Sequence, residues 1–286
     1  MDAGSVMITQ GQWRAARAAV RETGERFAAL LEAVDARVMA TRHWSVADTA
    51  AHVVIVAWLD HYLLNPDIDP PPVPGLADVL AATTVDTVEM LNDHCLRHFI
   101  ERDPRWLAAR LRADIDRLLQ ASEDLDPEMP VDWLGGSRVP LGGLLAHLVN
   151  ELQIHGWDIA RATGSRWEMA PADAAMFMEL FVCGLARHGL GRLQERAEPP
   201  PERRIAVEFR SKYTAPAVLV IRGHNAFLGE PGRNIDVRVS YDPVTLNLML
   251  FGRLSRLRAV LTGKVLIGGR RPWLLFGFLR AVRFPS

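Results

Sequence analysis

Apolar side chains recur every three to four positions through most of the first 196 residues, which is the spacing of amphipathic helices. This period predicts helices over residues 9–38, 46–64, 76–100, 104–120, 141–163 and 171–196. Loops rich in proline or glycine separate some of them, at 65–75 and 122–140. Ser45 and Asp48 have the spacing of a capping box at the start of the helix at 46–64, and Gly164 is expected to end the helix at 141–163. The helix at 46–64 is apolar almost all round, so we expect it at the centre of a helical bundle.

The period changes after residues 198–202, where three prolines between two glutamates predict a stiff linker. Beyond the linker, short apolar runs separated by turn residues predict strands at 205–209, 217–221, 235–239 and 263–268. Two short helices are predicted as well, at 246–251 and 271–283. The pattern therefore predicts a two-domain α+β protein, with a helix bundle over 1–197, the linker at 198–202 and a small α+β domain over 203–286.

The composition narrows the class of partners. The chain has 286 residues and a net charge of −1, so no overall basic excess points to a nucleic acid. Its two cysteines are too few for a disulfide framework, and no signal peptide is recognised at the start, so we expect a cytoplasmic protein. No uncharged apolar run reaches about twenty residues, which predicts no membrane insertion. The last apolar stretch, 272–284, predicts a packed helix, with a helix on a membrane surface as the alternative.

The helix at 141–163 carries the most informative chemistry. Glu151 and His155 lie four residues apart, and a helical wheel places both beside the apolar stripe rather than opposite it. His52 lies on an apolar face of the helix at 46–64. A carboxylate that borders a core needs a partner, and two histidines with one glutamate suit Zn²⁺ with an open fourth position. The competing interpretation pairs Glu151 with an arginine across the bundle.

Other candidates are weaker. On the wheel His147 lies further from the core, which favours a solvated side chain or one beside the ligands. Asp158 has two interpretations, one in which it orients His155 and one in which it is solvated. The pair His94 and His98 is interpreted as surface or packing residues, since no third ligand is evident. Cys183 is interpreted as a small buried side chain, so any nucleophile has to come from a metal or a cosubstrate.

Two segments with these residues resemble known proteins. The sequence Trp44–His52 resembles the metal-binding motif of the DinB-like helix bundles, and Glu151–Gly164 resembles a segment of the mycothiol-dependent maleylpyruvate isomerase-like proteins. Residues 261–269 are similar to the sterol-carrier-like domain that is often fused to these bundles. The resemblance implies a DinB-like up-down four-helix bundle with extra helices, followed by a sterol-carrier-like domain.

The resemblance also implies a site and a chemistry. It places the zinc ligands of the family on His52, Glu151 and His155, with Zn²⁺ or another divalent metal as the ion. It implies mycothiol as a thiol cosubstrate and a small electrophile as substrate. In an isomerase the thiolate adds to a cis double bond beside a carbonyl, the resulting single bond rotates, and the trans bond forms as the thiol leaves. In an S-transferase the same adduct is the product.

Some questions remain open in the sequence. A diacid substrate would need a cationic clamp, for which Arg222, Arg238 and Arg253 are candidates by residue type alone. The alternative function is a non-enzymatic protein that binds an apolar, lipid-like or sterol-like ligand on a metal-stabilised scaffold. A third interpretation is a stress-response metalloprotein without turnover. The oligomeric state is expected to be a monomer or a homodimer.

Overall fold

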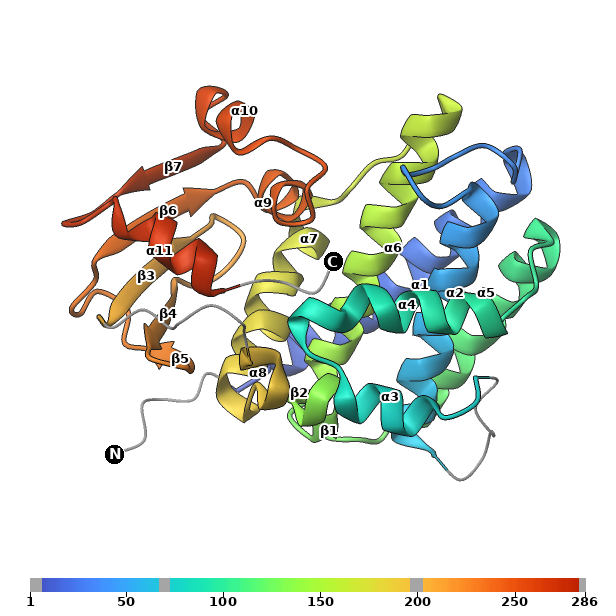
Figure 1. Ribbon diagram of the computed structural model, residues 1–286, viewed down its shortest axis with the longest axis horizontal. Coiled ribbons are helices and arrows are strands. Elements are labelled where there is room, and N and C mark those ends of the chain that lie inside the picture. The colour runs from blue at the N-terminus through green and yellow to red at the C-terminus, as the bar shows by residue number, and fades with distance from the viewer. Residues whose placement is uncertain (1–6, 67–72, 196–202, 283–286) are drawn as a thin grey trace.

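The computed structural model describes residues 7–66, 73–195 and 203–282, as a helical region followed by a sheet domain (Figure 1). The predicted α+β class and the order of its two parts are confirmed. The linker predicted at 198–202 lies outside the described residues, so the domain boundaries remain a prediction. Within the described ranges, no helix is both long and apolar enough to cross a bilayer.

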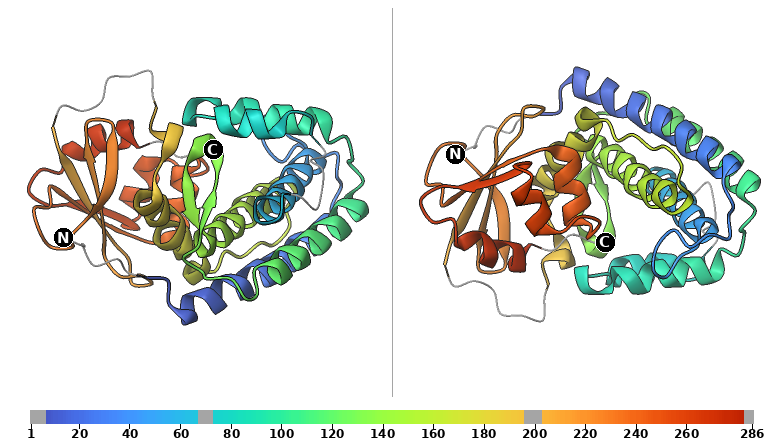
Figure 2. Two further views of the ribbon diagram at one scale, coloured as in Figure 1. Left: turned by 90° about the horizontal axis from the view of Figure 1, so that it is seen from below. Right: turned by 90° about the horizontal axis from the view of Figure 1, so that it is seen from above.

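Four long helices form the bundle, and their bounds are α1 (Gln10–Ala33), α2 (Val46–Leu64), α5 (Pro104–Ala121) and α6 (Leu141–Thr163). Both α1 and α2 pack against α5 and α6. Thus α1 and α2, although consecutive among the long helices, lie diagonally across the bundle (Figure 2). The segment 34–45 joins them across one end of the bundle. As predicted, Gly164 ends α6 in the left-handed conformation that glycine tolerates best.

The helix predicted at 76–100 is broken into α3 (Leu76–Ala82), a 3₁₀ turn at Val85–Thr87 and α4 (Val88–His98). The break occurs because Thr83 is extended and the next residue, Thr84, exchanges capping hydrogen bonds with Thr87. These two β-branched residues favour a cap over continued helix.

Two further segments differ from the prediction. The segment 122–140, predicted as a loop, contains a small hairpin of β1 (Pro130–Asp132) and β2 (Arg138–Pro140). The helix predicted at 171–196 consists of α7 (Pro171–Met176), a π-helical turn and α8 (Cys183–His188), and it ends at Gly189, whose φ is +117°. Glycine at a positive φ stops a helix regardless of the apolar period around it.

The sheet domain has five strands in the order β5-β4-β3-β6-β7, in which only β3 and β6 run parallel. The five strands are β3 (Ile205–Arg210), β4 (Ala217–Arg222), β5 (Asn225–Gly229), β6 (Val237–Tyr241) and β7 (Val265–Gly268). The sequence predicted all of them except β5. The segment that forms β5 lies between two turn signals and escaped prediction. Its helices are α9 (Pro243–Leu250), α10 (Arg256–Leu261) and α11 (Leu274–Ala281), of which α10 was not predicted.

The two parts share one core. A continuous cluster of buried apolar residues runs from the bundle through the π-helical turn into the sheet domain. A buried polar contact also joins them, because Asn247 of α9 donates to the side chain of Asn150 on α6, at 3.1 Å. The sheet domain is therefore held against the face of the bundle to which α6 belongs.

Candidate metal centre

The start of α2 fixes the position of His52. The Ser45 side chain accepts a hydrogen bond from the Asp48 backbone, and the Asp48 carboxylate accepts one from the Ser45 backbone, both at 3.1 Å. This predicted capping box is present, so the helix begins at Val46. His52 then lies nearly two turns into the helix, with its side chain buried in the bundle.

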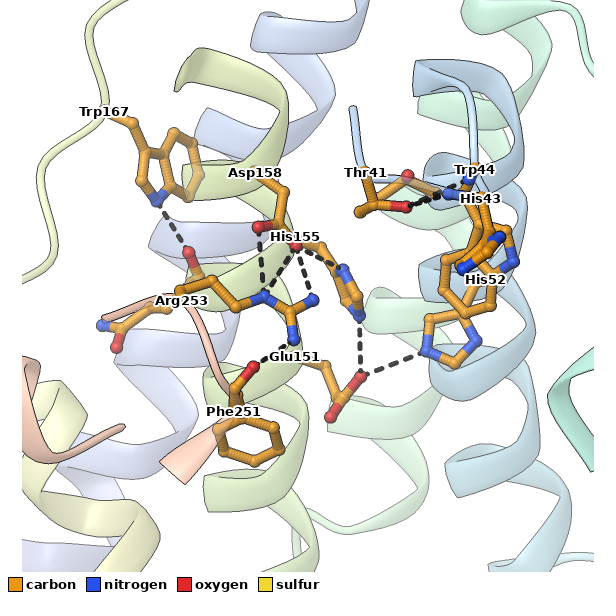
Figure 3. A network of polar contacts seen from close by, with 12 residues as sticks. Thr41, His43, Trp44, His52, Glu151, His155, Asp158, Trp167, Phe251 and Arg253 are labelled. Carbon is orange, nitrogen blue, oxygen red and sulfur yellow. Dashed lines mark hydrogen bonds and ion pairs between the residues drawn. The ribbon is translucent and has the colours of Figure 1, made fainter. Parts of the chain in front are cut away.

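The side chain of His52, from α2, meets those of Glu151 and His155, one turn apart on α6. The Nε2 atom of His52 lies 3.2 Å from Oε2 of Glu151, and the Nε2 atom of His155 lies 3.4 Å from the same oxygen (Figure 3). Glu151 is only 9% exposed. The expectation that Glu151 and His155 border the core is confirmed, and His52 reaches both of them.

These distances suit a shared cation. Bonds of 2.0–2.1 Å at tetrahedral angles place neighbouring ligand atoms roughly 3.3–3.4 Å apart. All three ligand atoms of His52, Glu151 and His155 lie within 4.8 Å of one another. Two imidazoles and one carboxylate are also a donor set that zinc accepts in open sites. The residues therefore fit a divalent ion without rearrangement of the backbone.

The pKa shifts of the three side chains also favour a bound cation. Burial alone would favour a neutral Glu151, but hydrogen bonds from His155 and His52 hold its pKa well below the usual range. Burial likewise opposes a charged His155, yet hydrogen bonds to Asp158 and Glu151 raise its pKa. For His52 burial prevails and lowers the pKa. The cluster thus keeps a negative charge on Glu151 and favours one positive charge beside it, which a bound metal ion would supply.

Of the two interpretations of His147, the solvated side chain is wrong, and the position beside the candidate ligands is supported. Its Nε2 atom lies 3.5 Å from Oε1 of Glu151, the oxygen that does not face the other two histidines. Its ring packs between Trp133 and Phe181, with centroids 5.1 Å and 4.8 Å away. These aromatic rings come from the hairpin region and the π-helical turn, which a wheel of α6 alone does not include. His147 therefore packs beside Glu151 rather than in water.

Asp158 is not solvated but lies buried beside His155, which favours the interpretation in which it orients that ring. Its Oδ2 atom lies 3.4 Å from Nδ1 of His155, and its side chain is buried. Arg253 of the sheet domain donates two hydrogen bonds to the same carboxylate, from Nε to Oδ1 at 3.1 Å and from Nη2 to Oδ2 at 2.7 Å. A carboxylate on the outer nitrogen of a histidine fixes the tautomer that leaves Nε2 free to bind a metal.

Of the three arginines proposed to bind a diacid substrate, only Arg253 lies beside the candidate metal centre. Arg253 reaches the centre through Asp158, whereas Arg222 is exposed at the end of β4 and Arg238 pairs with Glu208 on the sheet. Among the described residues no ion pair joins Glu151 to an arginine, so the competing interpretation of that carboxylate is not supported.

The cluster lines a cavity of about 1200 Å³ between α2, α4, α6 and the segment 251–253. Trp44 covers the two imidazoles, with its ring centroid 4.9 Å from that of His52 and 6.0 Å from that of His155. The cavity wall also carries four arginines that the sequence did not single out, Arg42, Arg97, Arg102 and Arg161. The centre is therefore open to a polar ligand of considerable size.

The remaining sequence candidates lie apart from the cavity, as predicted. Cys183 is buried, and burial raises the pKa of its thiol to about 12, so it is not a ready nucleophile. On α4, His94 is half-buried and His98 is exposed, and their rings are tilted by 49° with centroids 4.5 Å apart.

The sequence was compared with known proteins and families. The family described as "Mycothiol maleylpyruvate isomerase N-terminal domain" matches residues 13–160, which is more than half of the chain. The chain belongs to this family. The match includes α2 and most of α6, with all three residues of the cluster. No curated protein sequence matches the chain. The match ends at residue 160, so the resemblance of the sheet domain to sterol-carrier-like domains stays a prediction.

Two solved structures are similar to this member of the family. The crystal structure of the mycothiol-dependent maleylpyruvate isomerase has 15% sequence identity and a TM-score of 0.48, covering 85% of this chain and 90% of that one. The structure of a mutant of that enzyme has 14% identity and a TM-score of 0.47, covering 90% of this chain and 92% of that one.

One buried acid in the cavity wall has no partner. Asp60 lies two turns beyond His52 on α2, is 1% exposed, and neither of its oxygens has a hydrogen-bond partner among the described residues. Burial, with a smaller contribution from the charge of Glu151, raises the pKa of Asp60 well above its ordinary value. The folded protein therefore keeps this proton at a pH where the unfolded chain has lost it.

This proton predicts a pH-dependent gain in stability for Asp60→Asn. Above about pH 4 the unfolded chain releases the proton and the folded state does not, so the parent protein loses about 1.4 kcal/mol of stability per pH unit until the folded-state pKa is passed. Asparagine does not titrate, so the stability of the variant does not fall with pH in this way. Its advantage in chemical denaturation should widen as the pH rises, whereas Asp93→Asn, an exposed acid of the same cavity, should show none. An advantage of constant size at all pH values would contradict the assignment.

Proposed function

We propose that this chain is a metal-dependent enzyme that uses mycothiol as a thiol cosubstrate and acts on a small electrophile. The metal, zinc or another divalent ion, would be held by His52, Glu151 and His155. The observation that carries the proposal is that the ligand atoms of these three residues lie within 4.8 Å of one another in the wall of a cavity of about 1200 Å³. Family membership supports the choice of thiol.

A divalent ion bound there would lower the pKa of a thiol and present it as a thiolate at neutral pH. The residues of the chain supply the rest. Asp158, held by Arg253, keeps the Nε2 atom of His155 directed toward the cavity. Trp44 shields the two imidazoles from water on one side. The arginines of the wall favour anionic groups on the substrate, such as carboxylates.

The experiment measures turnover of maleylpyruvate by the metal-loaded protein, with mycothiol, with cysteine as a matched thiol, or with neither. Turnover is expected with mycothiol and not without it. Equal turnover in all three conditions would refute the proposal. The fate of the thiol then separates the two reactions, because an isomerase returns it and needs only a catalytic amount, whereas an S-transferase consumes one thiol for each product.

The apolar-ligand alternative has less support. A hollow lined entirely by apolar surface lies between the sheet, α9, α10 and α11, but its volume is about 70 Å³. Pockets that hold drug-sized ligands have volumes of about 300–1,000 Å³. The hollow would have to expand several-fold to take a sterol or an acyl chain. The cavity beside His52, Glu151 and His155 is already large enough for a small polar ligand.

A further inference from the structure

The sheet domain has an unusual distribution of charge. From Pro243 to the last residue the sequence has no aspartate or glutamate, but eight arginines and lysines. All 34 acidic residues and only 25 of the 33 basic residues precede Pro243, which gives a net charge of −9 there and +8 after it. The near-neutral total therefore conceals a strongly cationic segment, which includes α9, α10, β7 and α11.

The same segment exposes large apolar side chains. Seven of them lie within twenty residues of one another in the sequence: Leu257, Val260, Leu261, Leu266, Ile267, Trp273 and Phe276. Half of the exposed large apolar residues in the described ranges are among these seven. The helices and the strand that carry them adjoin, because Val260, Ile267 and Leu275 line the same small hollow. Such a concentration on one part of a surface marks an interaction site.

Both helices present apolar and cationic groups together. On α11 the buried residue is Phe278, and the opposite face carries Trp273, Phe276 and Arg280, of which the two aromatic side chains are 68% and 66% exposed. On α10 the buried residue is Ala259, and the outward face carries the leucines at 257 and 261 between two exposed arginines. Tryptophan, leucine and arginine in this arrangement are typical of helices that lie in a membrane interface.

We propose that the face formed by α10, β7 and α11, in the sheet domain and away from α2 and α5 (Figure 1), docks on the surface of an anionic lipid bilayer. Arginine and lysine side chains would contact lipid phosphates, while the exposed aromatic and leucine side chains would enter the interface. A symmetric contact between two copies of this face would bring cation against cation, which disfavours a second copy as the partner. The proposal is independent of the reaction at the metal centre.

The test is co-sedimentation of the full-length protein with vesicles of phosphatidylcholine alone or with roughly one third phosphatidylglycerol. We expect binding to the anionic vesicles only, and a decrease in binding as salt rises, since surface charges are screened. The double variant W273S/F276S should bind at least about tenfold more weakly, because both aromatic groups leave the interface. Both side chains are largely exposed, so the variant should fold, as its melting temperature would verify.

The matched control is M90S/I100S, which removes two other highly exposed apolar side chains, both in the helical region. Its vesicle binding should equal that of the parent. Equal binding to neutral and anionic vesicles, no binding to either, or unchanged binding of W273S/F276S would each overturn the proposal. A lipid-free dimer that W273S/F276S abolishes would also overturn it, because the face would then be a self-association surface.

Discussion

Replacement of Glu151 by glutamine should abolish stoichiometric zinc binding. The parent protein is expected to bind about one zinc per chain. In the variant the amide cannot supply the negative charge, and the two imidazoles that now lie 3.2 Å and 3.4 Å from the carboxylate oxygen lose the third ligand. The zinc affinity should fall more than about 100-fold, beyond the effect of losing an outer partner. Metal content after dialysis, and the zinc-dependent rise in melting temperature, would measure it.

The double variant H52A/H155A tests the same assignment from the histidine side. It should retain no stoichiometric zinc, because only one of the three donors remains. The matched control is H94A/H98A, which removes the histidine pair of α4, outside the cavity lining, and should keep the full metal content. Stoichiometric metal in H52A/H155A would place the ion elsewhere and refute the ligand assignment.

Replacement of Asp158 by asparagine should weaken zinc binding by about 10–100-fold without removing a ligand. The carboxylate now lies 3.4 Å from Nδ1 of His155 and holds the tautomer in which Nε2 binds the ion. Asparagine keeps the shape but not the charge, and it leaves Arg253 without its ionic partner. Competition with a chromogenic zinc chelator would measure the change in affinity.

A second aspartate–arginine pair provides the control for this effect. Asp132 and Arg138 form an ion pair in the hairpin, at 3.0 Å, with both side chains largely exposed. Asp132→Asn should leave the zinc affinity unchanged, since exposed pairs contribute little and this one does not adjoin the cluster. If Asp158→Asn binds zinc as tightly as the parent, Asp158 does not orient His155, and its contact with Arg253 serves only to join the two parts of the chain.

Local sequence rules predicted the elements that carry the cluster. The capping box at Ser45 gave the first residue of α2, and the wheel of α6 placed Glu151 and His155 beside the core, because both depend only on neighbours along one helix. Their assignment as metal ligands stays a prediction. The same rules missed the break at Thr83, where a threonine cap ended an otherwise continuous apolar period.

The surroundings of the cluster could not be predicted, because they depend on tertiary contacts. Nothing in the sequence placed the ring of Trp44 over two imidazoles, or the ring of His147 between Trp133 and Phe181. Arg253 was a candidate by residue type only, and its pairing with Asp158 required the sheet domain to lie against α6. The exposed face of the sheet domain was likewise hidden, since a net charge of −1 averages over two oppositely charged regions.

The contact between Arg253 and Asp158 couples two equilibria, metal binding in the bundle and docking of the sheet domain on α6. If docking of the sheet domain tightens the hold of His155 on a metal, then the bound metal must tighten the docking by the same free energy. Loss of the ion would then loosen the contact between α6 and the sheet domain, and any event that displaces the sheet domain would favour release of the ion. A ligand that acts on the sheet domain alone would in this way regulate the metal content of the bundle.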